Sequence, residues 1–174
     1  MVVGPATAAS PQQRADRMLL SLGDLGSAYT VKFSGNRTLI DVSAGDSATV
    51  RKELARSWVS GAEHGFRGKS VDRGVISQAD VFRKGARMNL ILRAWQQDVL
   101  RISDGTREQL PRTAPGTGGA LVRGHLFAYE LLIYMWRHGR AISSVDVTGL
   151  NGTVPVSLVM KLARVQDARM ASAG

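Results

Sequence analysis

The fold of this chain depends on one stretch, 120-ALVRGHLFAYELLIYMWRH-138. Its residues are apolar almost without interruption, and Glu130 is its one acidic residue. A run this long is typical of a helix that is buried all round. Gly139 follows directly, and Arg137 and His138 occupy the last predicted turn, where the helix dipole favours cations. We therefore expect a central apolar helix over residues 120–138.

A second long helix is predicted upstream, over residues 78–101, with Ser77 as its N-cap. Apolar side chains recur there with the 3.6-residue period of a helix face. Arginines fall around the opposite side of the helical wheel, which predicts an amphipathic helix with a basic outer face. The apolar positions are Val81, Met88, Leu92, Trp95 and Val99, and the basic ones are Arg83, Arg87, Arg93 and Arg101.

Two further helices are indicated by their start signals. Ser10 followed by Pro11 is an N-cap with proline at the first helical position, and this helix should run to about residue 22. Asp46 or Ser47 can cap another helix, whose apolar face repeats every four residues and which should end near residue 61 or 65.

Strands are predicted near both ends of the chain. Apolar and polar residues alternate around a Ser-Gly-Asn-Arg turn at positions 34–37, which predicts a β-hairpin over residues 28–43. A second hairpin is predicted over residues 143–163, because Asn151-Gly152 separates two alternating runs. A helix from Pro155 to Met170 is the alternative for the second half of that segment.

These elements predict a single α+β domain, in which the two β-hairpins pack with three main helices. A length of 174 residues suits one domain, and an apolar content of 44% excludes general disorder. Residues 1–9 are expected to form a flexible arm, and residues 10–174 the domain, with a long loop rich in glycine and proline at 103–119. The chain has no cysteine, which excludes disulfides and thiolate metal sites.

No catalytic, metal or cofactor motif is recognisable. The three histidines lack metal-ligand spacing. Glu130 has two interpretations, a catalytic carboxylate with a raised pKa, or a carboxylate that is paired with an arginine at the edge of the core or points into an interface. The glycines at 116–119 lack the Lys-Ser/Thr of a phosphate-binding loop, which favours a plain hinge. We expect neither a cofactor nor a metal, and no enzymatic activity.

Positive charge is concentrated in the middle of the chain. The net charge is +9, and residues 51–101 hold eleven Lys and Arg against five Asp and Glu. Acidic partners one helical turn away are scarce, so a basic surface is expected to attract phosphates independently of base sequence. The predicted nucleic-acid-binding residues are Arg67, Lys69, Arg73, Arg83, Arg87, Arg93 and Arg101.

The predicted function is a non-enzymatic structural subunit of a large repetitive assembly, such as a virus or phage particle. Residues 1–9 and 103–119 cannot bury enough surface to hold themselves, so contacts with other subunits are expected. The partners would be copies of the chain or other subunits, and the basic face would meet either DNA or RNA through phosphate contacts or an acidic neighbouring subunit. The alternatives are a free sequence-nonspecific nucleic-acid-binding protein and, third, a small enzyme.

The expected location is the virion, for an assembly subunit, or the cytoplasm. Residues 1–10 lack a positively charged segment and a long apolar core, so secretion through a signal peptide is not expected. The longest nearly apolar run, residues 126–136, is too short to span a bilayer, and no membrane partner is expected.

Overall fold

The computed structural model describes residues 9–43, 46–69 and 72–173, and all statements below concern these residues. They form one seven-stranded sheet and six helices. In chain order the elements are α1 (Pro11–Arg17), α2 (Leu22–Leu25), β1 (Tyr29–Arg37), α3 (Leu39–Ser43), α4 (Ala48–Ser57), β2 (Trp58–Gly68), β3 (Gly74–Phe82), α5 (Met88–Ile102), β4 (Thr106–Glu108), β5 (Thr117–Leu126), β6 (Tyr129–His138), β7 (Ala141–Leu150) and α6 (Val156–Ala173).

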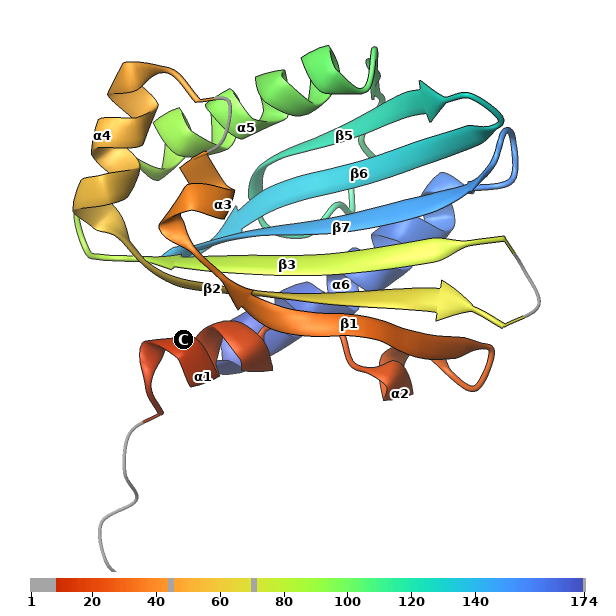
Figure 1. The fold of residues 1–174 in the computed structure, drawn as a ribbon, viewed down its shortest axis with the longest axis horizontal. Coiled ribbons are helices and arrows are strands. Elements are labelled where there is room, and N and C mark those ends of the chain that lie inside the picture. Colours follow the sequence, from red (N-terminus) through yellow and green to blue (C-terminus); the bar gives the residue numbers. More distant parts are fainter. Residues whose placement is uncertain (1–8, 44–45, 70–71, 174) are drawn as a thin grey trace, which may run out of the picture.

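The strands lie in the order β1-β2-β3-β7-β6-β5-β4, and every neighbouring pair is antiparallel. Two meanders therefore meet in the middle of the sheet, where β3 pairs with β7. Between them the chain crosses through α5 to the far edge and returns strand by strand. This connection places α5 across the face of the second meander (Figure 1).

Helices cover both faces of the sheet. On one face α1 and α6 pack against the central strands, and Trp136 and Tyr134 lie in this core. On the other face α3, α4 and α5 enclose a second core that contains Phe82, Ile133 and Met135 (Figure 1). None of the helices in the described part of the chain combines the length and apolar character needed to cross a bilayer.

The predicted helix at 120–138 is wrong. This stretch forms the hairpin of β5 and β6, with its turn at Phe127 and Ala128. Side chains of β6 alternate between the two faces of the sheet. Trp136 packs in the core on the α6 side, and Ile133 packs in the core on the α5 side. A strand buried on both faces has no polar alternation, and periodicity alone cannot distinguish it from a buried helix. Ile133 and Trp136 are nevertheless buried, as predicted, while the side chain of Leu126 lies outside the described residues.

The predicted helix at 78–101 is correct only in its second half. Residues 78–82 belong to β3, and α5 begins at Met88. The apolar positions from Met88 onward do form the inner face of α5, where Leu92 is fully buried. Val81 fits the helical period by coincidence, because it is a strand residue facing the α6 side of the sheet.

Neither predicted hairpin forms as such. The chain does not turn at residues 34–37, because β1 continues through them and pairs with β2. After β7 the Asn151-Gly152 turn leads into α6, so the alternative of a helix from Pro155 to Met170 is confirmed with slightly shifted bounds. Residue 155 is a proline just before the helix, where its missing N–H leaves no hydrogen bond unmade.

Of the three helix starts predicted from capping residues, those at Ser10 and Ser47 are confirmed, and the one at Ser77 is wrong because Ser77 lies within β3. Ser10 forms a reciprocal capping box with Gln13, and Ser47 caps α4 by accepting a hydrogen bond from the Val50 N–H. Both helices are shorter than predicted. The predicted loop at 103–119 contains β4 and the start of β5, and the predicted arm at 1–9 falls almost wholly outside the described residues. The α+β class is confirmed.

Candidate functional site

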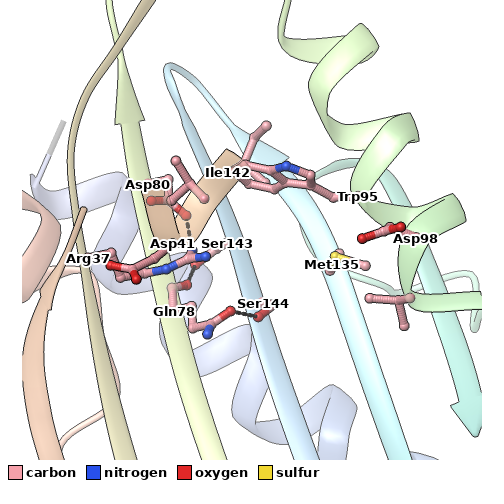
Figure 2. A pocket seen from close by; sticks show the side chains of 12 residues that line it. Arg37, Asp41, Gln78, Asp80, Trp95, Asp98, Met135, Ile142, Ser143 and Ser144 are labelled. Atoms are coloured by element: carbon pink, nitrogen blue, oxygen red, sulfur yellow. Dashed lines mark hydrogen bonds and ion pairs between the residues drawn. The ribbon is translucent and has the colours of Figure 1, made fainter. Parts of the chain in front are cut away.

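A pocket of about 150 Å³ lies where α3 and α5 meet the sheet face that carries the second core. Figure 2 shows Arg37, Asp41 and Asp80 on one side of it, and Trp95 and Asp98 of α5 on the other. Its lining combines polar and apolar groups, so it is suited to a ligand with both. The full lining is Arg37, Asp41, Val42, Gln78, Asp80, Trp95, Asp98, Val99, Met135, Ile142, Ser143 and Ser144.

Arg37 and Asp80 form an ion pair at the base of the pocket, although their strands are not neighbours. Arg37 ends β1 and pairs in register with Gly61 of β2, which pairs in turn with Asp80 of β3. Residues in register point to the same face of a sheet. The guanidinium therefore crosses over Gly61, and a side chain there would overlap Asp80 Oδ1.

Asp80 is almost fully buried, and two donors hold it. Trp58 Nε1 donates to Asp80 Oδ1 at 3.0 Å, and Arg37 Nη1 donates to Oδ2. Burial raises the pKa of Asp80 to about 6, while the charge of Arg37 and the Trp58 hydrogen bond act in the opposite direction. Both carboxylate oxygens are occupied, so Asp80 holds Arg37 in place.

Helix α5 supplies the opposite wall. Trp95, Asp98 and Val99 are spaced i, i+3 and i+4 and so lie on one face of the helix. Trp95 Nε1 donates to Asp46 Oδ2 at 3.3 Å, which fixes the orientation of the indole. The Arg37 guanidinium lies 5.9 Å from the centre of that ring, a distance at which a cation is attracted to the aromatic face.

Two acidic side chains of the lining have oxygens with no hydrogen-bond partner in the described residues. Thr38 donates its N–H and its hydroxyl to Asp41 Oδ2, and these hydrogen bonds lower the pKa of Asp41. Arg101 donates to Asp98 Oδ1 at 2.6 Å. In both residues the second carboxylate oxygen is left to accept a hydrogen bond from a ligand.

A polar strip continues from the pocket across the middle of the sheet. Ser144 donates to Gln78 Oε1 at 3.1 Å, and Gln78 Nε2 donates to Glu63 at 3.1 Å. Asp146 lies beside this strip, and its Oδ1 is buried without a hydrogen-bond partner in the described residues. Burial raises the pKa of Asp146 to about 6.

The hydroxyls of the two serines in the lining are engaged by other groups. The hydroxyl of Ser143 is bonded to the Gln78 carbonyl and that of Ser144 to the Gln78 amide, so neither is placed as a nucleophile beside a base. Within the described residues, no three His, Cys, Asp or Glu side chains are grouped in a way that could hold a metal ion.

The predicted basic residues do not form one face. Arg67, Lys69 and Arg73 lie around the β2–β3 connection, whereas the other four lie beyond the opposite end of β3 or on α5. At about 3.3 Å per residue, the nine residues of β3 separate Arg83 from Arg67, Lys69 and Arg73 by roughly 30 Å. Arg83, Arg87, Arg93 and Arg101 are all exposed.

The structure decides between the two interpretations of Glu130. Its side chain is 1% exposed, forms an ion pair with Arg123 and accepts a hydrogen bond from the Val154 N–H. It is therefore a carboxylate paired at the edge of the core. The glycines at 116–119 lead into β5 and not into a helix, so no helix N-terminus follows them.

Sequence reasoning missed the residues that form the pocket. Arg37 and Asp80 are 43 positions apart, and Asp80 lies inside the segment 78–101 that the sequence pattern predicts as a helix. Gly61 was an available signal, because a glycine inside a strand often marks the close approach of another group. Because the sequence pattern places a helix end near residue 61 or 65, Gly61 is interpreted there as a helix terminator and not as a glycine within a strand.

Comparisons with known proteins identify the fold. No protein-family model matches the sequence, and no curated protein matches it either. The structure resembles the crystal structure of the extracellular domain of PknH from Mycobacterium tuberculosis, with a TM-score of 0.59 and 8% sequence identity. The match covers 94% of this chain and 96% of that chain. The protein is thus a single α+β domain with a seven-stranded antiparallel sheet, similar in fold to the PknH extracellular domain.

Proposed function

We propose that the protein is a non-enzymatic binding domain whose pocket takes a small organic cation, a compact apolar group bearing a protonated amine. The observation that carries this proposal is that the indole of Trp95 and the carboxylates of Asp41 and Asp98 line the same pocket. Each carboxylate has one oxygen without a hydrogen-bond partner in the described residues. A protonated amine can donate to the carboxylates and lie against the aromatic face.

Charge favours a cation over an anion. The lining has three carboxylates and one guanidinium, so it stays net negative even though Arg37 pairs with Asp80 and Arg101, outside the lining, pairs with Asp98. An anion would lie close to Asp41 and Asp98, whose negative charges would repel it. The pocket is therefore an acidic site on a protein whose net charge is +9.

Size limits the ligand to a small group. The pocket holds about 150 Å³, comparable to an engineered core cavity that binds benzene. One six-membered ring or a branched alkyl group fills such a space, and the apolar side chains of Val42, Met135 and Ile142 would contact it. A whole polymer chain or a large cofactor does not fit.

The test compares three probes of one shape and different charge by calorimetric titration: benzylammonium, benzyl alcohol and benzoate. We expect benzylammonium to bind at least tenfold more tightly than the other two. Asp98→Asn should remove most of this preference, whereas Asp104→Asn, which changes an exposed acid outside the pocket, should not. Equal binding of the three probes, or none, would overturn the proposal.

The other predictions of function remain predictions. Neither a role as a structural subunit of an assembly nor a location in the virion or cytoplasm is addressed by a likeness in fold. Nonspecific binding to nucleic acid also stays a prediction.

A further inference from the structure

A second hollow lies at the start of α5, away from the pocket. It has a volume of about 460 Å³ and is bordered by the first turn of α5, by Arg93 and by Arg137 of β6. Arg93 and Trp95 are two positions apart, which turns them about 200° around the helix. The hollow and the pocket therefore use different faces of α5.

Three guanidinium groups border this hollow, and its lining contains no acidic residue. Arg87 precedes α5, Arg93 lies in its second turn, and Arg137 lies near the end of β6. In the described residues none of the three side chains has a hydrogen-bond or ion-pair partner. Their positive charges are therefore not neutralised locally, which is costly unless solvent or an anion faces them.

The acidic residue that contacts the start of α5 is already occupied. Glu53 of α4 accepts a hydrogen bond from the backbone N–H of Arg87 at 2.9 Å and pairs with Arg56 at 2.6 Å. Hydrogen bonds from Arg56 lower the pKa of Glu53, so it is ionised and committed to these partners. It holds α4 against the start of α5 and leaves the side chain of Arg87 without a partner.

The backbone at the start of α5 adds further donors of the same kind. Arg87 provides no side-chain cap for the helix. The N–H groups of Met88 and Asn89 have no acceptor within the helix, and both residues line the hollow. A helix N-terminus carries partial positive charge and adds to the field of the three arginines.

We propose that this hollow binds a phosphate group. Guanidinium groups match the tetrahedral oxygens of phosphate through paired N–H donors, and three of them from two separate elements can surround a dianion. The site is independent of the proposed function of the pocket. The phosphate would belong to a phosphorylated small molecule or to a nucleic-acid backbone, since both present the same oxygens.

The test is calorimetric titration with pyrophosphate at low salt. We expect one molecule to bind per chain. Arg93→Gln and the double variant Arg93→Gln/Arg137→Gln should weaken binding about tenfold or more. Arg107→Gln, which removes the same charge from an exposed site on β4, should change the affinity less than twofold. Arg93 is exposed on a helix surface, so its single variant gives an answer even if the half-buried Arg137 is needed for folding.

Absence of pyrophosphate binding, or equal weakening by Arg93→Gln and Arg107→Gln, would overturn the proposal, because the effect would then be one of overall charge. A mixed-sequence twelve-nucleotide single strand identifies the source of the phosphate. If it displaces pyrophosphate and loses affinity in the same variants, the ligand is a nucleic-acid backbone. If it does not, the ligand is a phosphorylated small molecule, and the site is supported in either case.

Discussion

Arg37 of β1 is paired with Asp80 of β3 across the intervening strand β2. The pair is possible because residue 61, which lies between them in register, is a glycine. It ties the edge strand of the first meander to the strand that meets the second meander. It also forms the base of the pocket, so the stability of the sheet and the shape of the site depend on the same contact.

A methyl group at position 61 should break this contact. In Gly61→Ala the Cβ would overlap Asp80 Oδ1 and lie 3.2 Å from the Cβ of Arg37. We expect a loss of about 1–3 kcal/mol in the free energy of unfolding, as for other overpacked sites. Denaturant unfolding measures it. Gly35→Ala is the matched control, because no atom lies within 4 Å of its added Cβ, and an equal loss in both variants would contradict the account.

Removing Arg37 should make stability more sensitive to pH. In Arg37→Met the buried Asp80 loses its counter-ion, and its pKa, already raised by burial to about 6, should rise further. The folded state of the variant then resists ionisation of Asp80. The free energy of unfolding should therefore fall by about 3 kcal/mol relative to the wild type above pH 7, and by much less below pH 5. Adding Asp80→Asn should restore most of this loss. A loss that is constant with pH would contradict the ion pair.

Asp146 should destabilise the fold once it ionises. Burial raises its pKa from 3.8 to about 6, so the folded state binds more protons than the unfolded state between these values. The stability contribution of Asp146 therefore falls as pH rises from about 4 to 6. The difference in free energy of unfolding between Asp146→Asn and the wild type should be about 1–3 kcal/mol more favourable to the variant at pH 8 than at pH 4. Asp104→Asn, which changes an exposed residue, should show no such gain. If Asp146→Asn also showed no gain, the burial of Asp146 would be contradicted.

Glu130 should show the opposite dependence on pH. Burial acts to raise the pKa of Glu130, but hydrogen bonds from Val154 and Arg123 outweigh it and lower the pKa. Its contribution to stability is present above the unfolded pKa and is lost as pH falls through the folded one. Glu130→Gln should therefore cost about 1–3 kcal/mol at pH 7 and less at pH 3. Urea unfolding at the two values checks this, and a cost that grows on acidification would contradict the ion pair.

Local signals in the sequence were sufficient for two helix starts, those of α1 and α4, but not for the one predicted at Ser77. The caps at Ser10 and Ser47 depend on side chains that reach only three residues along the chain, so their chemistry can be recognised without the tertiary structure. The β5–β6 hairpin could not be predicted in this way. Each strand is buried on both faces, and the turn at Phe127-Ala128 carries none of the usual Gly, Asn or Pro residues.

The pocket depends on long-range pairing that the sequence does not display. Arg37 reaches Asp80 through the register of three strands, and Trp95 reaches them only because α5 crosses the sheet. The concentration of arginines near the start of α5 was visible in the sequence. Arg137 was not part of that pattern, because it belongs to β6 and reaches the start of α5 only in the folded chain.

The central claim, that the pocket binds an organic cation, is tested most directly by the three indole N–H signals in a ¹⁵N–¹H NMR spectrum. Trp95 lines the pocket and Trp58 donates to Asp80 at its base. Trp136 is an internal control, because it lies in the core on the opposite face and donates to Asp167 of α6. On addition of benzylammonium, we predict saturable shifts of the Trp95 and Trp58 signals and no shift of the Trp136 signal. Equal movement of all three signals, or movement of none, would contradict the claim.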